Sequence, residues 1–403
     1  MPALPAPQRA DAALDAARAL APWLAGQAAR IEAQRRIPDD VAQRLADAGM
    51  FRLTLPPRYG GLGLAPRIAW QATMELAAGC GSCAWVHGLG SANVLMIGKF
   101  SRAAQDEVFG DARPAIIPML TGGVGHDIVA RREPGGVVLS GRWRYASGID
   151  VASWVGLLVP LPTGGGEAGA PGEPHVVLVP QRAFTIDQDS WQVLGMRGTG
   201  SKDIALAPTF VPEHRWMRWA ALQSGERHPE CPNPEPLYDF PLTTVFAMSV
   251  LAPTLGVASA AVDEYAGIVR DRVASGTRER AIADKSTHVE LAQARAQTDL
   301  LVQALLADSD AVMATVAEGR ALSLAQRASM RMKYALASRT ALQACQRLFA
   351  SLGGSLLPAG TRIERQFRDL HSMCSHFLLQ PEPIGEAYGR LMLGLELPPN
   401  ARL

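Results

Sequence analysis

The sequence predicts a mainly helical α+β fold, in which helical segments at both ends of the chain enclose a β-rich middle. Apolar residues recur at helical spacing before residue 110 and again after residue 241. From Ile116 to about Val211 the pattern changes to short runs rich in β-branched residues, with turn residues between them. Because strands and helices do not alternate along the chain, neither a doubly wound sheet nor a barrel of alternating strands and helices fits this order.

A chain of 403 residues is long enough for two or three domains. The changes of pattern predict an N-terminal helical domain over 1–114, a central β-domain over 115–221, a linker over 222–241 and a C-terminal helical bundle over 242–403. The linker is rich in proline and polar residues, which are typical of connecting segments.

The first helix is expected over residues 9–34, where large apolar residues recur near helical spacing. A short second helix begins at Pro38 and ends at Gly49, because proline and acidic residues favour a first turn and glycine favours an end. Proline and glycine make 51–63 a loop. Three further helices are expected at about 66–80, 82–99 and 101–109.

The middle of the chain contains five runs with the composition of strands. They cover 128–132, 137–142, 154–159, 176–179 and 204–210. The insert over 162–174 is of low complexity, rich in glycine and proline, and is expected to form a mobile hairpin tip.

A hairpin is expected after the turn at Gly135 and Gly136. At period two its strand would carry Trp143, Tyr145 and Ser147 on one face. Two interpretations are open for this face. It forms either a flat aromatic platform with a hydroxyl at its tip, or a half-buried sheet face that packs on a helix.

After Pro241 the periodicity is helical again. Helices are expected near 243–275, 284–318 and 322–352, then, past a Gly-Gly break, near 360–377 and 382–394. The segment 241–262 has no charged residue and is long enough to span a membrane. Its prolines, glycine and hydroxyl residues, and its isolation in a chain of amphipathic helices, favour a buried core helix.

The net charge of +1, from 39 basic and 38 acidic residues, argues against nucleic acid and anionic membranes as partners. The N-terminus has no basic segment followed by an unbroken apolar core, so we expect no signal peptide. The five cysteines are odd in number and scattered, unlike a secreted disulfide scaffold. A reducing cytoplasm is the simplest compartment for such a chain.

Cys80 and Cys83 form a CxxC pair, and His87 follows four residues later. A zinc site would need further ligands, and the segment from His371 to His376 is the nearest source, but its spacing is not a usual zinc pattern. Small residues at a tight helix start are the better explanation. Both His87 and His376 are either packed core residues or proton-transfer groups.

The segment Gly195–Ser201 superficially resembles a phosphate-binding loop, but a strand rather than a helix is expected after it. The sequence contains no GxGxxG after a strand, no GxxxxGK[ST] and no GxSxG. A nucleotide held by a P-loop or a Rossmann turn is therefore not expected.

Together with three motifs, the order of the parts resembles the acyl-CoA dehydrogenase superfamily. The motifs are Gly141–Gly148, Trp191–Ser201, and Leu352-Gly353-Gly354 followed by Arg368-Asp369. The resemblance extends from about residue 15 to 395 and implies a C-terminal four-helix bundle and a homo-oligomer, expected to be a homotetramer.

One departure from the dehydrogenases bears on the reaction. Their common type has a glutamate base about nine residues after the Arg-Asp pair, where this chain has Phe377, and no carboxylate follows until Glu382. The chain is similar instead to the two-component flavin-dependent monooxygenases, which include phenol hydroxylases and dibenzothiophene-type sulfur oxygenases. This resemblance implies reduced FMN or FAD from a separate reductase, O2 as co-substrate and a small apolar or aromatic substrate.

The resemblance also implies roles for single residues. His376 would be the catalytic imidazole, Ser147 a hydrogen-bond donor near the N5–C4a edge of the flavin, and His87 a second catalytic histidine. Trp191 would pack on the isoalloxazine ring, which leaves Trp143 and Tyr145 as packing residues. Further flavin contacts are expected from Thr121, Ser201 and Arg272.

Two other functions stay open from the sequence. One is an acyl-CoA dehydrogenase or flavin oxidase with an unconventional base, and the other is a non-catalytic scaffold with the flavin fold.

Overall fold

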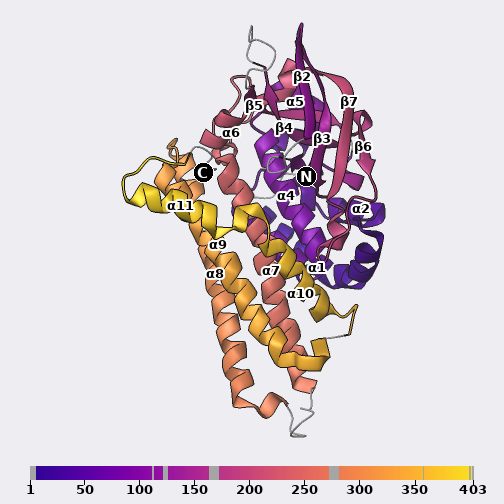
Figure 1. Ribbon diagram of the computed structural model, residues 1–403, viewed down its shortest axis with the longest axis vertical. Coiled ribbons are helices and arrows are strands. Elements are labelled where there is room, and N and C mark those ends of the chain that lie inside the picture. The colour runs from indigo at the N-terminus through magenta and orange to yellow at the C-terminus, as the bar shows by residue number, and fades with distance from the viewer. Residues whose placement is uncertain are drawn as a thin grey trace.

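The computed structural model describes residues 6–110, 113–120, 126–162, 172–271, 281–356, 358–398 and 401. Most of the insert at 162–174, and the predicted flavin contacts Thr121 and Arg272, lie outside these ranges. The described chain has the predicted order of helices, strands and helices (Figure 1). The mainly helical α+β fold is therefore confirmed, whereas the domain limits at residues 114, 221 and 241 stay a prediction.

The N-terminal part is helical, as its periodicity predicts. Its helices are α1 (Ala6–Gln34), α2 (Asp39–Asp47), α3 (Pro66–Ala77), α4 (Gly81–Ile97) and α5 (Arg102–Phe109). Local sequence sets several of their ends. Pro66 opens α3 at a position where its missing N–H costs nothing, and the Ser101 hydroxyl caps α5 by accepting a hydrogen bond from Ala104 N over 3.2 Å.

Two four-stranded sheets form the middle of the chain, in the orders β1-β4-β5-β8 and β2-β3-β7-β6. Their strands are β1 (Met119–Leu120), β2 (His126–Glu133), β3 (Gly136–Ala146), β4 (Trp154–Leu161), β5 (Glu173–Pro180), β6 (Phe184–Asp187), β7 (Lys202–Pro212) and β8 (Trp216–Arg218). All five predicted runs are strands. The three strands that the sequence did not predict, β1, β6 and β8, have two to four residues, too few to show an alternation.

The predicted hairpin is present, since Glu133 on β2 pairs with Gly136 on β3. The prediction that Trp143, Tyr145 and Ser147 lie on one face of the strand is wrong. The pairing of β3 with β7 shifts register between Trp143 and Ala146, so that Trp143 is fully buried in the sandwich core while Tyr145 is 59% exposed. A bulge adds one residue to the strand, and the side chains beyond it change face.

The C-terminal part consists of long helices that lie side by side (Figure 1). They are α7 (Leu242–Asp271), α8 (Lys285–Ala317), α9 (Leu324–Leu352), α10 (Arg362–Cys374) and α11 (Pro381–Met392). A short helix, α6 (Trp219–Ser224), crosses the predicted start of the linker at residue 222. Two helices, α7 and α8, are long and apolar enough to cross a membrane. Because 94% of the apolar window of α7 is buried inside the protein, the prediction of a core helix is confirmed; for α8 the fraction is 33%.

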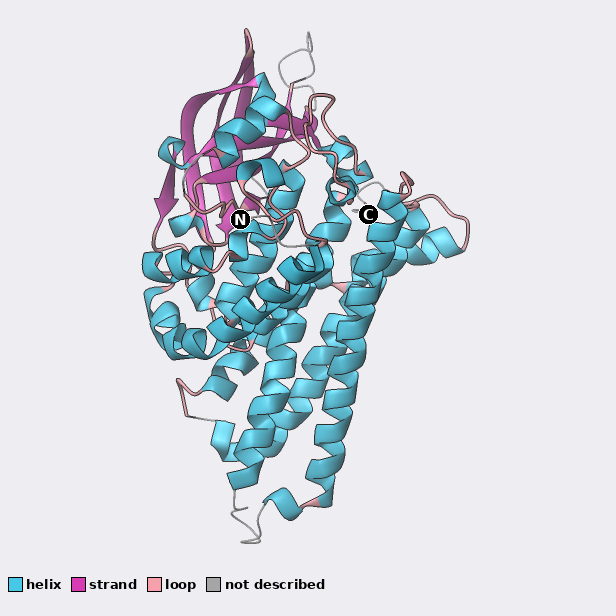
Figure 2. Cartoon of the chain, turned by 180° about the vertical axis from the view of Figure 1, so that it is seen from behind, coloured by secondary structure: helices cyan, strands magenta, loops and turns pink. Residues whose placement is uncertain are grey.

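Helix α7 packs against the N-terminal helices α3 and α4, while both sheets lie at one end of the molecule (Figure 2). Glycines allow the close approach of these helices. A Cβ on Gly256 would lie 2.6 Å from Ala77 Cβ and 2.8 Å from Met74 Cα, and one on Gly88 would lie 2.6 Å from the Ser249 carbonyl oxygen. The packing of α3 and α4 on α7 therefore depends on residues without a side chain.

The substitution Gly256→Ala is expected to lower the free energy of unfolding by about 1–3 kcal/mol, because the new methyl group meets backbone atoms of α3 that cannot move aside. Gly267→Ala, on the same helix with nothing within 4 Å of its Cβ position, is the matched control and is expected to be neutral or stabilising by up to about 1 kcal/mol. Urea unfolding measures both. Equal stability of the two variants would contradict the proposed contact.

Candidate active site

The main candidate site is a cavity of about 630 Å³ between the β-sandwich, α4, α7 and the end of α10. Its wall is mostly apolar, with a few hydroxyl groups, one imidazole and the guanidinium of Arg144. It is lined by Trp85, Leu89, Met119, Leu120, Arg144, Tyr145, Ser147, Trp191, Val193, Leu194, Gly195, Met196, Ser201, Phe246, Ser372, Ser375, His376, Phe377 and Leu378. A concave, mostly apolar site with few polar groups is typical of a pocket for a small molecule.

The cavity brings together four of the predicted site residues from distant parts of the sequence. Ser147 follows β3, Trp191 and Ser201 belong to the loop between β6 and β7, and His376 follows α10. None of these segments is adjacent to another along the chain, so only the tertiary fold makes them neighbours.

His87 is not part of this group. It lies fully buried in α4, where Nδ1 is 2.8 Å from Thr73 Oγ1 and Nε2 is 3.0 Å from the Met50 carbonyl oxygen. Burial lowers the pKa of His87 to about 4. This placement supports a packing role, and a catalytic role for His87 has no support from the geometry.

The CxxC pair lies at the start of α4, where Cys80 is the N-cap residue and both thiols are buried and free. A Cβ on Gly81 would lie 3.1 Å from Asp369 Oδ2, so the helix start is tightly packed. Within the described ranges, no group of three or more histidine, cysteine or acidic side chains is placed to hold a metal ion. The small residues are therefore explained by packing.

A chain of hydrogen bonds runs along one wall of the cavity. Trp85 Nε1 donates to Ser147 Oγ over 3.3 Å, and Ser147 Oγ lies 2.8 Å from Ser201 Oγ. Ser201 Oγ lies 2.7 Å from Thr199 Oγ1, which donates to the Met196 carbonyl oxygen over 2.9 Å. An indole N–H can only donate and a carbonyl can only accept, so the two ends fix the direction of the whole chain.

The direction determines what the cavity wall offers to a ligand. Each hydroxyl in the chain donates its single proton toward Met196, and therefore Ser147 and Ser201 have only a lone pair left to present. The sequence assigned Ser147 as a hydrogen-bond donor. In this arrangement it acts as an acceptor, and the ligand edge that faces it needs an N–H or O–H group.

His376, in contrast to the two serines, presents a hydrogen-bond donor to the cavity. Leu378 N donates to His376 Nδ1 over 3.3 Å, so Nδ1 carries no proton and the neutral ring has its proton on Nε2. Burial, together with the positive charge of Arg331, lowers the pKa of His376 to about 4. At neutral pH the side chain is therefore a neutral imidazole that can donate a hydrogen bond from Nε2.

Trp191 is held at the edge of the cavity by its neighbours. Its Nε1 donates to the Met196 carbonyl oxygen over 3.3 Å, and Arg35 Nη1 donates to its carbonyl oxygen over 3.0 Å. The Tyr145 ring lies against it, with ring centroids 6.0 Å apart and an angle of 60° between the rings. Tyr145 is thus a cavity residue that sequence reasoning assigned to packing, because a bulge leaves no signal in the spacing.

The loop that carries Trp191 and Ser201 is clamped to the end of the helical bundle. Asp369 Oδ1 accepts a hydrogen bond from Met196 N over 2.6 Å, and Arg368 Nη1 donates to the Leu194 carbonyl oxygen over 3.0 Å. A Cβ on Gly195 would lie 2.2 Å from the Arg368 carbonyl oxygen, so the two backbones touch. The Arg-Asp motif therefore positions the cavity wall.

The fold and the cavity define a flavin enzyme of the acyl-CoA dehydrogenase type. The models of the acyl-CoA dehydrogenase N-terminal and C-terminal domains match residues 9–109 and 248–381. The chain is 30% identical to the oxygenase subunit HsaA, a flavin-dependent monooxygenase of Mycobacterium tuberculosis, over 96% of both chains. It is also 30% identical to the oxygenase component of an FADH2-dependent resorcinol hydroxylase of Rhizobium sp., over 92% of this chain and 91% of that one.

Among solved structures, XiaF from Streptomyces sp., in complex with FADH2 and glycerol, superposes with a TM-score of 0.90 at 26% identity, covering 99% of this chain and 98% of that chain. The chain therefore belongs to the acyl-CoA dehydrogenase superfamily, as an oxygenase component of its two-component flavin-dependent monooxygenases. Such a component uses reduced flavin from a separate reductase to oxygenate a small aromatic substrate.

The lining of the cavity agrees with this assignment. Among the described residues, its wall contains no aspartate or glutamate, and it includes Phe377, which the resemblance puts at the place of the dehydrogenase base. Removal of an α-proton from an acyl thioester needs such a base. An acyl-CoA dehydrogenase reaction therefore has no evident proton acceptor in this cavity.

The imidazole of His376 is expected to stay neutral from pH 8 down to pH 5 and to titrate with a pKa of about 4. As the pH falls from 6.5 toward 4, the unfolded state binds a proton that the folded state does not, so this group lowers stability in that window. NMR of ¹³Cε1-labelled histidine follows the titration, and loss of the signal in His376→Gln identifies it. A midpoint near 6.5 would contradict the burial argument.

Proposed function

We propose that this chain hydroxylates a carbon of a small aromatic ring held in the 630 Å³ cavity, with Ser147 and His376 acting at the reacting atoms. One observation carries the proposal. The hydrogen-bonded hydroxyl groups, the neutral imidazole of His376 and the aromatic rings of Trp191 and Tyr145 line one apolar cavity, and no carboxylate of the described residues lines it. Each of the three has a separate task.

The chemistry of the wall fits a reduced flavin. Trp191 and Tyr145 offer aromatic surface for a flat ring system, and Ser147 and Ser201 offer lone pairs to ring N–H groups. The N5 position carries a proton in reduced flavin and none in oxidised flavin, so acceptors on the wall favour the reduced form. When bound, reduced flavin supplies the electrons that activate O2.

His376 supplies the donor that the serine pair lacks. Its Nε2 proton stabilises negative charge that develops on an oxygen atom in the cavity. Because its pKa is about 4, the ring does not take up a proton from solvent at neutral pH, and it holds its proton on one side only. The T-shaped contact with Trp85, at 5.4 Å between centroids, keeps the ring in place.

Apolar side chains protect the reaction from water. Leu89, Phe246 and Leu378 come from α4, α7 and the segment after α10, and they give the cavity apolar walls from three parts of the chain. Exclusion of water strengthens the hydrogen bonds of Ser147 and His376 and prevents loss of activated oxygen to solvent.

We also propose a homotetramer in the cytoplasm. Helix α8 leaves Val289 and Leu300 47% and 66% exposed, which suits a contact with another subunit, and the five cysteines are free, which suits a reducing compartment. Multi-angle light scattering at micromolar concentration is expected to give four times the chain mass. A monomer would contradict the assembly.

Rapid mixing of reduced flavin and protein with aerated buffer tests the proposed roles. The protein is expected to give a transient absorbance that differs from both reduced and oxidised flavin, and Ser147→Ala is expected to shorten its lifetime about tenfold or more. Direct conversion to oxidised flavin without a transient, or bleaching of bound flavin by an acyl-CoA, would contradict the function.

Thr199→Val tests the hydroxyl chain, and the dissociation constants of reduced and oxidised flavin are the quantities measured. It removes the acceptor of the Ser201 proton without lining the cavity, so the preference for reduced over oxidised flavin is expected to fall about tenfold. Thr298→Val, on α8, removes a buried hydroxyl that bonds only its own helix and is the control. Equal flavin affinities in both variants would show that the direction of the chain has no effect.

A further inference from the structure

Asn93 has a buried side-chain amide, and among the described residues only its nitrogen atom has a hydrogen-bond partner. The residue lies on α4 and is 2% exposed, and its Nδ2 donates to the Ile117 carbonyl oxygen over 2.7 Å. A carbonyl can only accept, so the amide cannot be turned around, and its Oδ1 faces away from Ile117. This Oδ1 is buried and has no hydrogen-bond partner within the part of the chain that the structure describes.

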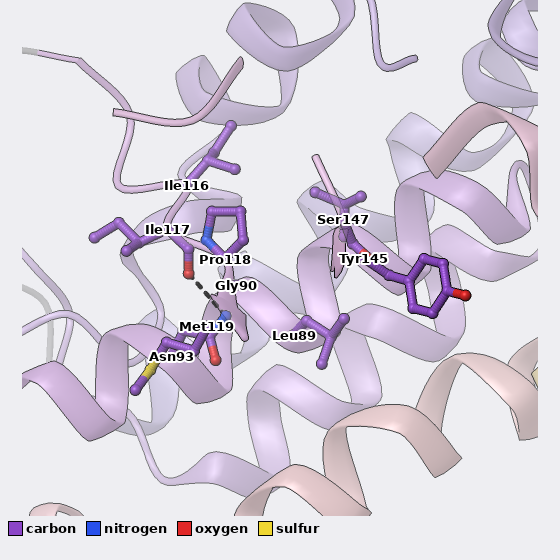
Figure 3. A pocket seen from close by; sticks show the side chains of 10 residues that line it. Leu89, Gly90, Asn93, Ile116, Ile117, Pro118, Met119, Tyr145 and Ser147 are labelled. Carbon is purple, nitrogen blue, oxygen red and sulfur yellow. Dashed lines mark hydrogen bonds between the residues drawn. The ribbon is translucent and has the colours of Figure 1, made fainter. Parts of the chain in front are cut away.

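The Asn93 side chain lines a small pocket of about 30 Å³ (Figure 3). The other walls come from α4, from the segment 116–119 and from the end of β3, and they are mainly apolar. Figure 3 shows the Asn93 amide reaching Ile117, with Leu89 between Asn93 and Tyr145 in this view. The pocket has room for one group of about the size of a water molecule.

The small pocket adjoins the main cavity. Leu89, Met119, Tyr145 and Ser147 line both of them. The two spaces are therefore neighbours, and a substituent of a ring in the main cavity that passes Leu89 and Met119 would reach Asn93. We refer to the small pocket as the inner end of the site.

An unpaired buried acceptor costs about 1–3 kcal/mol, so a bound group that satisfies it is strongly favoured over one that does not. Asn93 Nδ2 already has a partner in the Ile117 carbonyl, whereas Oδ1 has none among the described residues, so Oδ1 is the atom that a ligand has to satisfy. The complementary group is a donor, a hydroxyl or an amine, and not an ether, a halogen or a carboxylate.

We propose that Asn93 is a specificity-determining residue, whose Oδ1 accepts a hydrogen bond from a ring O–H or N–H group of the substrate in the small pocket. This inference rests on the proposed function, since it names the feature of the aromatic substrate that the inner end of the cavity recognises. Sites built to bond a hydroxyl reject analogues that lack it far more strongly than apolar pockets reject a change of size.

Matched ligands test the inference in the wild-type protein. Dissociation constants for phenol and anisole, and for aniline and N,N-dimethylaniline, are measured by quenching of tryptophan fluorescence, which Trp85 and Trp191 in the cavity wall make suitable. The donor of each pair is expected to bind about tenfold or more tightly. Equal binding within both pairs would overturn the inference.

The substitution Asn93→Leu assigns the discrimination to this residue. It keeps the approximate size and removes the acceptor, so the preference within each pair is expected to disappear. If melting curves and circular dichroism show that Asn93→Leu does not fold, Asn93→Ala replaces it, because alanine is smaller and also has no side-chain acceptor. A preference that survives in the folded variant would overturn the inference, as would a wild-type preference that neither variant changes.

The reaction with O2, measured on the same wild-type preparation, separates this inference from the proposed function. A transient absorbance with no discrimination between phenol and anisole contradicts the role of Asn93 and leaves the function standing. Discrimination without any transient supports the donor site and contradicts the function.

Discussion

The site depends on one constraint, the attachment of the loop between β6 and β7 to α10. The buried carboxylate of Asp369 accepts a hydrogen bond from Met196 N at 2.6 Å, and Met196 itself has a positive φ of 55°, a conformation that costs a non-glycine residue roughly 1 kcal/mol or more. Burial raises the pKa of Asp369 to about 6. Nearby, Glu32 of α1 pairs with Arg368 at 2.6 Å and with Arg365 at 2.8 Å, so three separate parts of the chain meet at this loop.

The Met196 carbonyl connects this attachment to the chemistry. It accepts hydrogen bonds from Thr199 and from Trp191, so the same residue orders the hydroxyl chain and orients the indole. The result is a cavity with fixed hydrogen-bond polarity, in which Ser147 accepts on one wall and His376 donates on another. A cavity of this kind stabilises charge through groups that are already oriented, and it needs no carboxylate to do so.

Residues that look alike in the sequence have different tasks in the structure. His87 lies in α4 and His376 follows α10, and burial lowers the pKa of both to about 4, yet of the two only His376 lines the cavity. Trp143 and Tyr145 lie two residues apart in a strand, yet a register shift separates them into core and cavity wall. The sequence does not mark Asn93 as a binding residue, because its role depends on a distant partner. The Ile117 carbonyl, 24 residues away, bonds Nδ2 and leaves Oδ1 for a ligand.

The sequence by itself determined the helices, the longer strands, the mainly helical α+β fold and the family, because periodicity, caps and ordered motifs are local properties of the chain. It also predicted, through the resemblance to the dehydrogenases, that Phe377 stands in place of a carboxylate base. Only the tertiary structure decided which side chains share the cavity, which way the Thr199–Ser201–Ser147 chain donates, and where a buried acceptor is left for a ligand. Bulges and the direction of hydrogen bonds are set by partners distant in sequence, and no local pattern contains them.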